Sequence, residues 1–194
     1  MDTFLLKLSA YFEELAAQFT NPVTAIAQIL GFIPVVMSFF IFHSNKRTTI
    51  IAAKAVSDGI SSLHFLLLGE ATGCAITCVN IFRGICFSQK GKKPWASGIW
   101  MPIAFCSLTV GSSCLGWTGT ESFLPMIGSC LAVMGYWCQK TAYLRLFNFI
   151  GLSFWIVYGV ITFSVPTVVQ NLIAVISIAI TQLRVSKRKS EETT

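Results

Sequence analysis

Seven apolar stretches fill most of this 194-residue chain. A helix of about twenty apolar residues crosses the hydrocarbon layer of a bilayer, because all of its backbone hydrogen bonds form within the segment. Charged residues make up 11% of the sequence, whereas a soluble domain contains about a quarter. We therefore predict an all-α membrane protein with seven transmembrane helices. Their expected bounds are Val23–His43, Thr48–Leu68, Ala71–Phe87, Ile99–Trp117, Ser122–Cys138, Leu146–Phe163 and Val165–Leu183.

Basic residues lie almost entirely on one side of these predicted helices. Of the 14 lysines and arginines, all but Lys7 fall on the side that also carries the C-terminus. The loops of a membrane protein that carry the excess of Lys and Arg are the cytoplasmic ones. We therefore expect the N-terminus outside and the C-terminus inside. The net charge of +6 is then a topology signal, and we expect no nucleic-acid partner.

One sequence pattern occurs twice in the chain. It consists of an aromatic residue, a glycine four positions later and an asparagine in apolar surroundings. The two copies are Phe65, Gly69 and Asn80, followed by Trp155, Gly159 and Asn171. Such internal similarity is typical of membrane proteins that are built from repeated units.

The two copies belong to two predicted three-helix units, Val23–Phe87 and Ser122–Leu183, with one extra helix between them. Three helices alone would leave the second unit upside down in the bilayer, whereas a linking helix keeps both units parallel. We predict a 3+1+3 architecture of two parallel three-helix-bundle repeats joined by a linker helix. The expected domains are 1–21, an interfacial amphipathic helix or a partly ordered leader; 22–88, the first repeat; 96–118, the linker transmembrane helix; 122–184, the second repeat; and 185–194, a cytoplasmic tail without helical structure.

The second predicted helix carries a polar stripe. At 100° per residue, four of its side chains fall within about 60° of one another, and these are Lys54, Asp58, Ser61 and Phe65. Asp58 would lie near the middle of the hydrocarbon layer, where a lone carboxylate costs about 2.5–3.5 kcal/mol. Lys54, one turn earlier, is its expected partner. Two interpretations stay open: a coupling site for a proton or cation, and a structural ion pair.

The second repeat carries an amide where the first has this acid. Asn148 corresponds to Asp58, Gly151 to Ser61 and Trp155 to Phe65. Any coupling charge would therefore belong to the first repeat alone.

The chain lacks the patterns of catalytic and metal sites. Its seven cysteines lie in apolar segments without a CxxC pair, and neither HExxH nor GxSxG occurs. We expect no catalytic residue, no metal and no cofactor. His64 lies off the polar stripe, and we expect a hydrogen-bonded packing role for it. We expect Arg83 to reach the inner lipid headgroups.

The first unit contains QILGFI and SFF, then KR before the second helix, then LHFLLLG with an asparagine eleven residues on. This order resembles the bacterial inner-membrane proteins of the YgjV type over about residues 23–185. The doubled architecture resembles the PQ-loop and SWEET (MtN3-like) transporter superfamily. The Pro-Gln pair of the PQ-loop is absent, and Ile41-Phe42 and Cys138-Gln139 occupy its places. The resemblance implies a bacterial inner membrane location, with the N-terminus periplasmic and the C-terminus cytoplasmic.

The SWEET resemblance also implies a central solute pocket. In that family an aromatic residue on the second helix of each unit and an asparagine on the third line the pocket, as Phe65 with Asn80 and Trp155 with Asn171 would here. The small position one turn before the aromatic is occupied by Ser61 and by its counterpart Gly151. The expected pocket residues, with the amide of the polar face, are Ser61, Phe65, Asn80, Asn148, Trp155 and Asn171.

Two functions remain open at this point. The first is a carrier or facilitator of a small polar solute, such as a sugar or metabolite, with Asp58 and Lys54 as its coupling group or ion pair. The second is a non-transporting receptor or accessory protein that docks through basic cytoplasmic loops. Buried asparagines could also simply link helices by hydrogen bonds. The expected partners are the lipid bilayer and a small polar solute, and a homo-oligomer is left open.

Overall fold

The computed structural model describes residues 9–10, 12–14, 16–17, 19–41, 46–117, 119–138 and 140–191. Within these residues the secondary structure is helical, with no strand. Most of the expected interfacial helix over 1–21 cannot be compared, because residues 1–8, 11, 15 and 18 lie outside the described part. Phe42 and Gln139, from the positions of the PQ-loop pair, also lie outside it.

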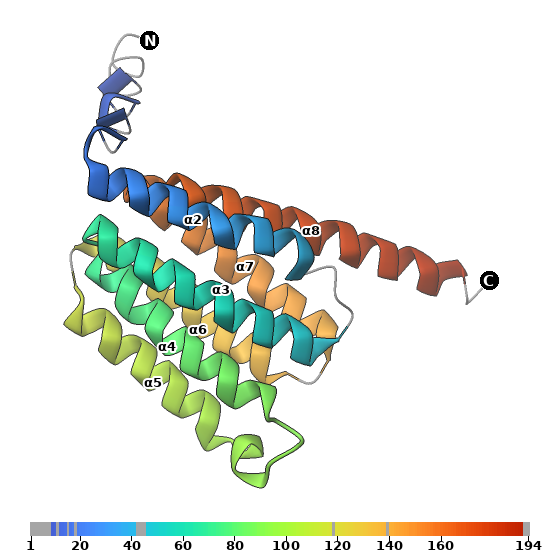
Figure 1. Cartoon of the computed structure of the whole chain (residues 1–194). Coiled ribbons are helices and arrows are strands. Elements are labelled where there is room, and N and C mark those ends of the chain that lie inside the picture. Colours follow the sequence, from blue (N-terminus) through green and yellow to red (C-terminus); the bar gives the residue numbers. More distant parts are fainter. Residues whose placement is uncertain are drawn as a thin grey trace.

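The described chain forms a bundle of long helices (Figure 1). They are α2 (Pro22–Ile41), α3 (Arg47–Leu68), α4 (Ala71–Ser88), α5 (Trp100–Leu115), α6 (Phe123–Trp137), α7 (Thr141–Ile161) and α8 (Val165–Glu191). Short 3₁₀ turns precede α5 and α6, at Pro94–Ser97 and Thr120–Ser122. Five of the helices, α2, α3, α4, α7 and α8, are long and apolar enough to cross a bilayer. α5 is a shorter apolar helix.

Local sequence explains where two of these helices stop and start. α3 ends at Gly69, whose φ of 80° places it in the left-handed region that glycine adopts without steric cost. The Gly69 N–H donates to the Leu66 carbonyl and closes the last turn. α8 begins directly after Ser164 with Pro166 in its first turn, where a proline's missing N–H costs no hydrogen bond.

Six helices close a ring, and the seventh lies outside it. Going around the ring, α2 packs on α3, α3 on α4, α4 on α6, α6 on α7, α7 on α8, and α8 on α2. α5 packs against α4 and α6 from outside. Successive helices alternate in direction, so that α2, α4, α6 and α8 run one way and α3, α5 and α7 the other (Figure 1).

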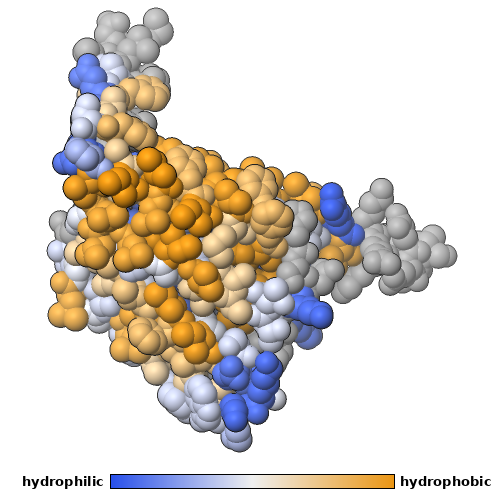
Figure 2. All heavy atoms as spheres, in the orientation of Figure 1, coloured by the Kyte–Doolittle hydropathy of each residue, from blue (hydrophilic) through white to orange (hydrophobic). Residues whose placement is uncertain are grey.

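The outer surface of the bundle is apolar. Large apolar side chains such as Ile29, Phe40 and Leu66 are exposed, whereas Asp58 and Arg83 are each only 2% exposed. Figure 2 shows a broad apolar band over the helices, with hydrophilic side chains gathered towards the ends. In a soluble protein large apolar side chains are mostly buried and charged side chains are mostly exposed. The spanning helices therefore contact lipid, and the polar residues face the interior of the ring.

The two ends of the bundle differ in charge. We call the end with Lys46, Lys90 and Lys140 the basic end, and the end with Glu70 and Glu121 the acidic end. The α4–α5 connection is tied to α6 at the basic end, where Lys90 Nζ donates to the Trp137 carbonyl over 2.5 Å.

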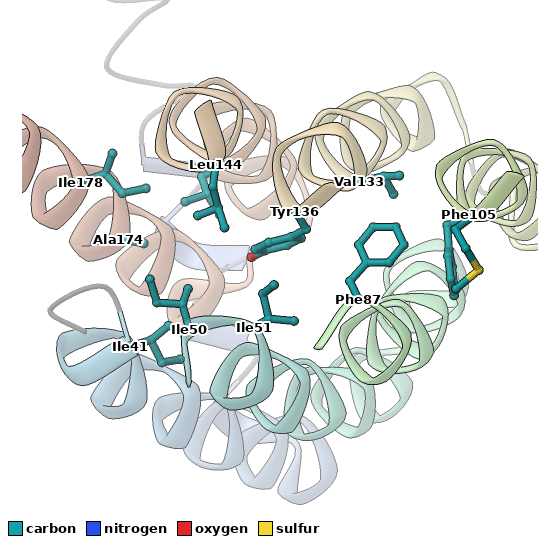
Figure 3. Close-up of a cluster of buried hydrophobic side chains, with 12 residues drawn as sticks. Ile41, Ile50, Ile51, Phe87, Phe105, Val133, Tyr136, Leu144, Ala174 and Ile178 are labelled. Atoms are coloured by element: carbon teal, nitrogen blue, oxygen red, sulfur yellow. The ribbon is translucent and has the colours of Figure 1, made fainter. Parts of the chain in front are cut away.

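Each end contains a packed apolar cluster. The larger one lies towards the basic end and includes Ile50, Ile51, Tyr136, Leu144 and Ile178. Figure 3 shows its side chains converging from both halves of the chain. We call it the basic-end cluster. The smaller one, the aromatic cluster, consists of Phe65, Ile76, Trp155 and Tyr158 and lies towards the acidic end.

Two helix bounds differ from the sequence expectation by more than two residues. α7 begins at Thr141 rather than at Leu146, so Arg145 is a buried helical residue and not part of a loop. α8 continues to Glu191, past the expected end at Leu183, and the expectation of an irregular tail after Val185 was therefore wrong. The helix can leave the apolar layer because residues beyond its last apolar turn are helix-compatible lysine, arginine and glutamate.

Candidate functional site

A polar cavity lies inside the helix ring, between the two apolar clusters. Side chains of α3, α4, α6, α7 and α8 line it. All eight residues that the sequence singled out are in its wall: Lys54, Asp58, Ser61, Phe65, Asn80, Asn148, Trp155 and Asn171. The structure adds polar residues that the sequence had not singled out: Thr77, Arg83, Ser129, Tyr136, Thr167 and Gln170. The repeat therefore brings residues from both halves of the chain to one space.

The cavity is small. The volume open to the centre of a water-sized sphere is about 40 Å³, which is room for roughly one to three water molecules. Pockets for drug-sized ligands usually measure about 300–1,000 Å³. This conformation therefore leaves a polar space inside the ring with room for water or a very small solute, and a sugar would need the helices to move apart.

The asparagines of the wall make no hydrogen bonds between helices in the described part of the chain. Asn148 Nδ2 donates to the Leu144 carbonyl over 2.7 Å, and Asn171 Nδ2 donates to the Thr167 carbonyl over 2.9 Å, each within its own helix. Asn80 Oδ1 is buried without a hydrogen-bond donor among the described residues. This arrangement disfavours a role as links between helices. The asparagine side chains therefore keep unused hydrogen-bonding groups in the cavity wall.

A cluster of three charged side chains lies on the basic side of the cavity. Lys54 Nζ contacts Asp58 Oδ1 at 2.6 Å, so the predicted ion pair within α3 is present. Arg83 of α4 is the third member, with its Nη2 atom 3.9 Å from Asp58 Oδ2. The Arg83 guanidinium also lies 4.8 Å from the centre of the Tyr136 ring, which provides a cation–π contact.

The placement of Arg83 corrects the sequence expectation. We expected this side chain to reach the lipid headgroups, but it is 2% exposed and points into the bundle. An arginine near a helix end can extend along the bilayer normal or turn inward. A buried carboxylate within reach favours the inward direction. The available signal was the spacing from Asn80, because residues three apart share a helix face.

Three aromatic rings close the acidic side of the cavity. The centroids of Phe65 and Trp155 are 5.8 Å apart, and Tyr158 lies 5.9 Å from Phe65 and 5.7 Å from Trp155. These separations are typical of tilted and edge-to-face aromatic pairs. The rings pack on one another, so they form a plug at this side of the cavity.

The plug is joined to the acidic end by a hydrogen bond. Tyr158 donates its hydroxyl proton to Glu70 Oε2 over 3.1 Å. Burial raises the pKa of the Glu70 carboxyl above its ordinary value; the hydrogen bond from Tyr158 opposes this change, and nearby Glu121 adds to it. The hydrogen bond from Tyr158 therefore joins the aromatic plug to a carboxyl group at the acidic end whose pKa is raised.

Helices α6 and α7 approach very closely beside the cavity. A Cβ atom added to Gly128 would lie 2.6 Å from the Gly151 carbonyl oxygen, and one added to Gly151 would lie 2.6 Å from the Gly128 oxygen. Both positions therefore require glycine. Small residues at such contacts let membrane helices pack backbone to backbone.

His64 lies behind the cavity wall and acts as a structural link. Its Nδ1 donates to the Ala27 carbonyl over 2.8 Å, and its Nε2 is paired with the Ser164 hydroxyl at 2.7 Å. These bonds join α3 to α2 and to the start of α8. The prediction of a hydrogen-bonded packing residue is confirmed.

Comparison with known proteins identifies the family of the chain. A model of the Imp-YgjV family, described as bacterial inner membrane protein, matches residues 25–189. No curated protein and no solved structure matches the chain.

Proposed function

The chain belongs to the Imp-YgjV family of bacterial inner membrane proteins, and from this premise we propose that it carries a small polar solute across that membrane. The observation that carries the proposal is the cavity, whose polar wall comes from both halves of the chain and includes the aromatic residue and the asparagine of both copies of the internal repeat. Polar groups buried at membrane depth are costly, and in transporters they mark the path of the solute. The proposal requires no catalytic residue and no cofactor.

We propose that all seven helices, α2 to α8, cross the bilayer as two parallel three-helix repeats with α5 as the linker. The contacts around the ring support this assignment. If α2, α3 and α4 correspond to α6, α7 and α8, then each contact in one half has a counterpart in the other, including α4 on α6 and α8 on α2. The basic end then faces the cytoplasm, the C-terminus is cytoplasmic and the N-terminus is periplasmic.

The same architecture supports a PQ-loop or SWEET-like mode of transport. The aromatic cluster closes the cavity on its periplasmic side, and the basic-end cluster closes it on its cytoplasmic side. In alternating access, one repeat rocks against the other and opens one side at a time. The small cavity of this conformation is then an occluded state, in which Phe65 and Trp155 cover the solute site.

A second function is favoured by one observation. α8 continues for several residues past its apolar part, to Glu191, and it does so at the basic end. A helix that projects from the bilayer could dock a cytoplasmic protein, as a receptor or accessory subunit would. In that case a solute would bind without crossing the membrane, or no solute would bind.

Uptake into proteoliposomes tests the proposal. We expect the purified protein to accelerate entry of at least one solute from a panel of sugars, amino acids and small organic acids. The double variant Asn80→Ala/Asn171→Ala should reduce that uptake at least about tenfold, because two buried hydrogen-bonding groups leave the site. It should still fold, since neither amide joins two helices. Ser153→Ala is the matched control, because Ser153 is exposed on α7 and its hydroxyl bonds within that helix.

Two results would contradict the proposal, the first at the carrier function and the second at the role of the cavity. One is an uptake rate equal to that of empty liposomes for the whole panel. The other is full uptake by Asn80→Ala/Asn171→Ala, which would remove the cavity from the solute path.

A further inference from the structure

The charges around the cavity do not cancel. Among the described residues of its wall, the side chains with a formal charge are Lys54, Asp58 and Arg83. Two cations and one carboxylate leave a net charge of +1, and Asp58 and Arg83 are each only 2% exposed. An uncompensated buried charge is costly, so a net positive site inside a membrane bundle favours an anion.

Arg83 has more donors than partners. A guanidinium carries five N–H donors. Among the described residues, its Nη1 reaches the Ser129 carbonyl over a long 3.4 Å, its Nη2 lies 3.9 Å from Asp58, and its Nε has no hydrogen-bond partner. Lys54 holds the nearer carboxylate oxygen at 2.6 Å. The Nε–Nη2 edge of Arg83 is therefore a buried donor fork without a close acceptor.

Two neutral groups beside this fork also have unused hydrogen-bonding capacity. Ser129 Oγ and Asn80 Oδ1 are buried, and neither has a hydrogen-bond partner among the described residues. Both residues line the same cavity as Arg83. Asn80 precedes Arg83 by three residues and thus shares its face of α4. The Ser129 hydroxyl can donate to an anion that the arginine holds, whereas Asn80 Oδ1 only accepts hydrogen bonds and is left for a donor group of the solute or for water.

We propose that the cavity binds a small monovalent carboxylate, held by the Arg83 fork and by the Ser129 hydroxyl. A planar carboxylate matches the fork with two parallel N–H···O bonds, and it brings the single negative charge that the site lacks. The small volume suits an anion of the size of acetate in the occluded state. This inference rests on the proposed function, because it names the chemical class of the solute.

Asp58 then has a defined role. It lowers the net charge of the site from +2 to +1, so that the anion binds weakly enough to leave again. Asp58 could also approach Arg83 directly and close the 3.9 Å gap. In that arrangement the fork is filled internally, and no carboxylate should bind.

The test is isothermal titration calorimetry, which measures the affinity of the purified full-length protein for acetate and lactate. Acetamide and lactamide are the neutral counterparts. Ionic strength is kept constant with the bulky HEPES anion. We expect the carboxylates to bind and the amides to bind at least about tenfold more weakly. Arg83→Gln should weaken carboxylate binding about tenfold to a hundredfold, whereas Asp58→Asn should tighten it.

Two further variants keep the test decisive if Arg83→Gln folds poorly. Arg83→Lys retains the charge without the fork and should lose affinity for carboxylates while chloride binding stays weak. Ser153→Ala, outside the cavity, should bind as the wild type does. The inference is overturned if carboxylates bind no better than amides, if chloride binds as tightly as acetate, or if Asp58→Asn weakens binding.

Uptake measurements separate this inference from the proposed function. Uptake of a neutral sugar without carboxylate binding would overturn the carboxylate site and leave the carrier intact. Carboxylate binding without uptake would support the site and favour the receptor instead.

Discussion

Phe65 and Trp155, which occupy equivalent places in the two copies of the repeat, pack against each other with ring centroids 5.8 Å apart. They come from α3 and α7, on opposite sides of the helix ring. Both rings also line the polar cavity. The contact therefore joins the two halves of the chain at the edge of the candidate site.

Truncating one ring of the plug should destabilise the fold. Phe65 is 1% exposed, and replacing a buried phenylalanine with alanine usually costs about 3–5 kcal/mol. We expect Phe65→Ala to lower the free energy of unfolding by about 3 kcal/mol, measured by denaturation in mixed detergent micelles. Phe82→Ala is the control, because Phe82 is 64% exposed on the lipid-facing surface, and it should change stability little. Equal losses for both variants would contradict the packing described for the plug.

The close contact of α6 and α7 predicts a large effect from a single methyl group. Gly128→Ala places its Cβ against the Gly151 carbonyl oxygen, so the helices must separate. We expect a loss of about 1–3 kcal/mol, as for other overpacked sites. Gly111→Ala is the matched control, since a Cβ there meets nothing within 4 Å, and helix propensity favours alanine. A stable Gly128→Ala protein with unchanged uptake would show that the two backbones are not in contact.

Stability should depend on the protonation of Glu70. Because burial raises its pKa above the ordinary value of 4.5, the folded state holds this proton more tightly than the unfolded state. The stabilisation is therefore fully present below the unfolded pKa and is lost as the pH rises through the folded pKa. We expect the midpoint of thermal unfolding to fall over this range in the wild type.

Glu70→Gln should remove this part of the pH dependence and raise the midpoint of thermal unfolding at neutral pH. Tyr158→Phe should shift the transition to higher pH, since the hydrogen bond that lowers the pKa of Glu70 is gone. Glu121→Gln removes only the smallest of the three effects and serves as the control. An unchanged pH profile in Glu70→Gln would contradict the assignment.

The position of the α5–α6 connection tests the seven-helix topology. If α5 and α6 cross the bilayer, a tag inserted after Gly119 lies in the periplasm; if they do not, it lies in the cytoplasm. We expect this tag to be accessible to an antibody in cells with a permeabilised outer membrane. A tag after Lys92 should become accessible only when the inner membrane is also opened. If the antibody cannot reach the first tag until the inner membrane is opened, only the five long helices cross the bilayer.

The apolar pattern predicted most of the helices, and the repeat predicted which of their faces meet. Phe65 with Trp155, and Asn80 with Asn171, could be identified because an aromatic residue followed by an asparagine after 15 or 16 positions occurs twice. All four residues line one cavity. Helix ends were harder to predict. Arg145 belongs to α7 rather than to a loop. A charged residue near the start of a helix looks the same in sequence as one in a connection.

The charge of the site depended on contacts that the sequence leaves open. Lys54 and Asp58 lie one turn apart on one helix, so their pairing could be predicted. Arg83 belongs to another helix, and its side chain is long enough to reach either the headgroups or Asp58. Tyr136 and Ser129 join the site through the packing of α6, which no local pattern specifies.

A crystal structure of the protein with a solute identified in the uptake assay tests the central claim most directly. The account predicts electron density for that solute inside the helix ring, within hydrogen-bond distance of both Asn80 and Asn171. Density bound elsewhere, with the cavity still filled by water or closed by apolar side chains, would contradict it.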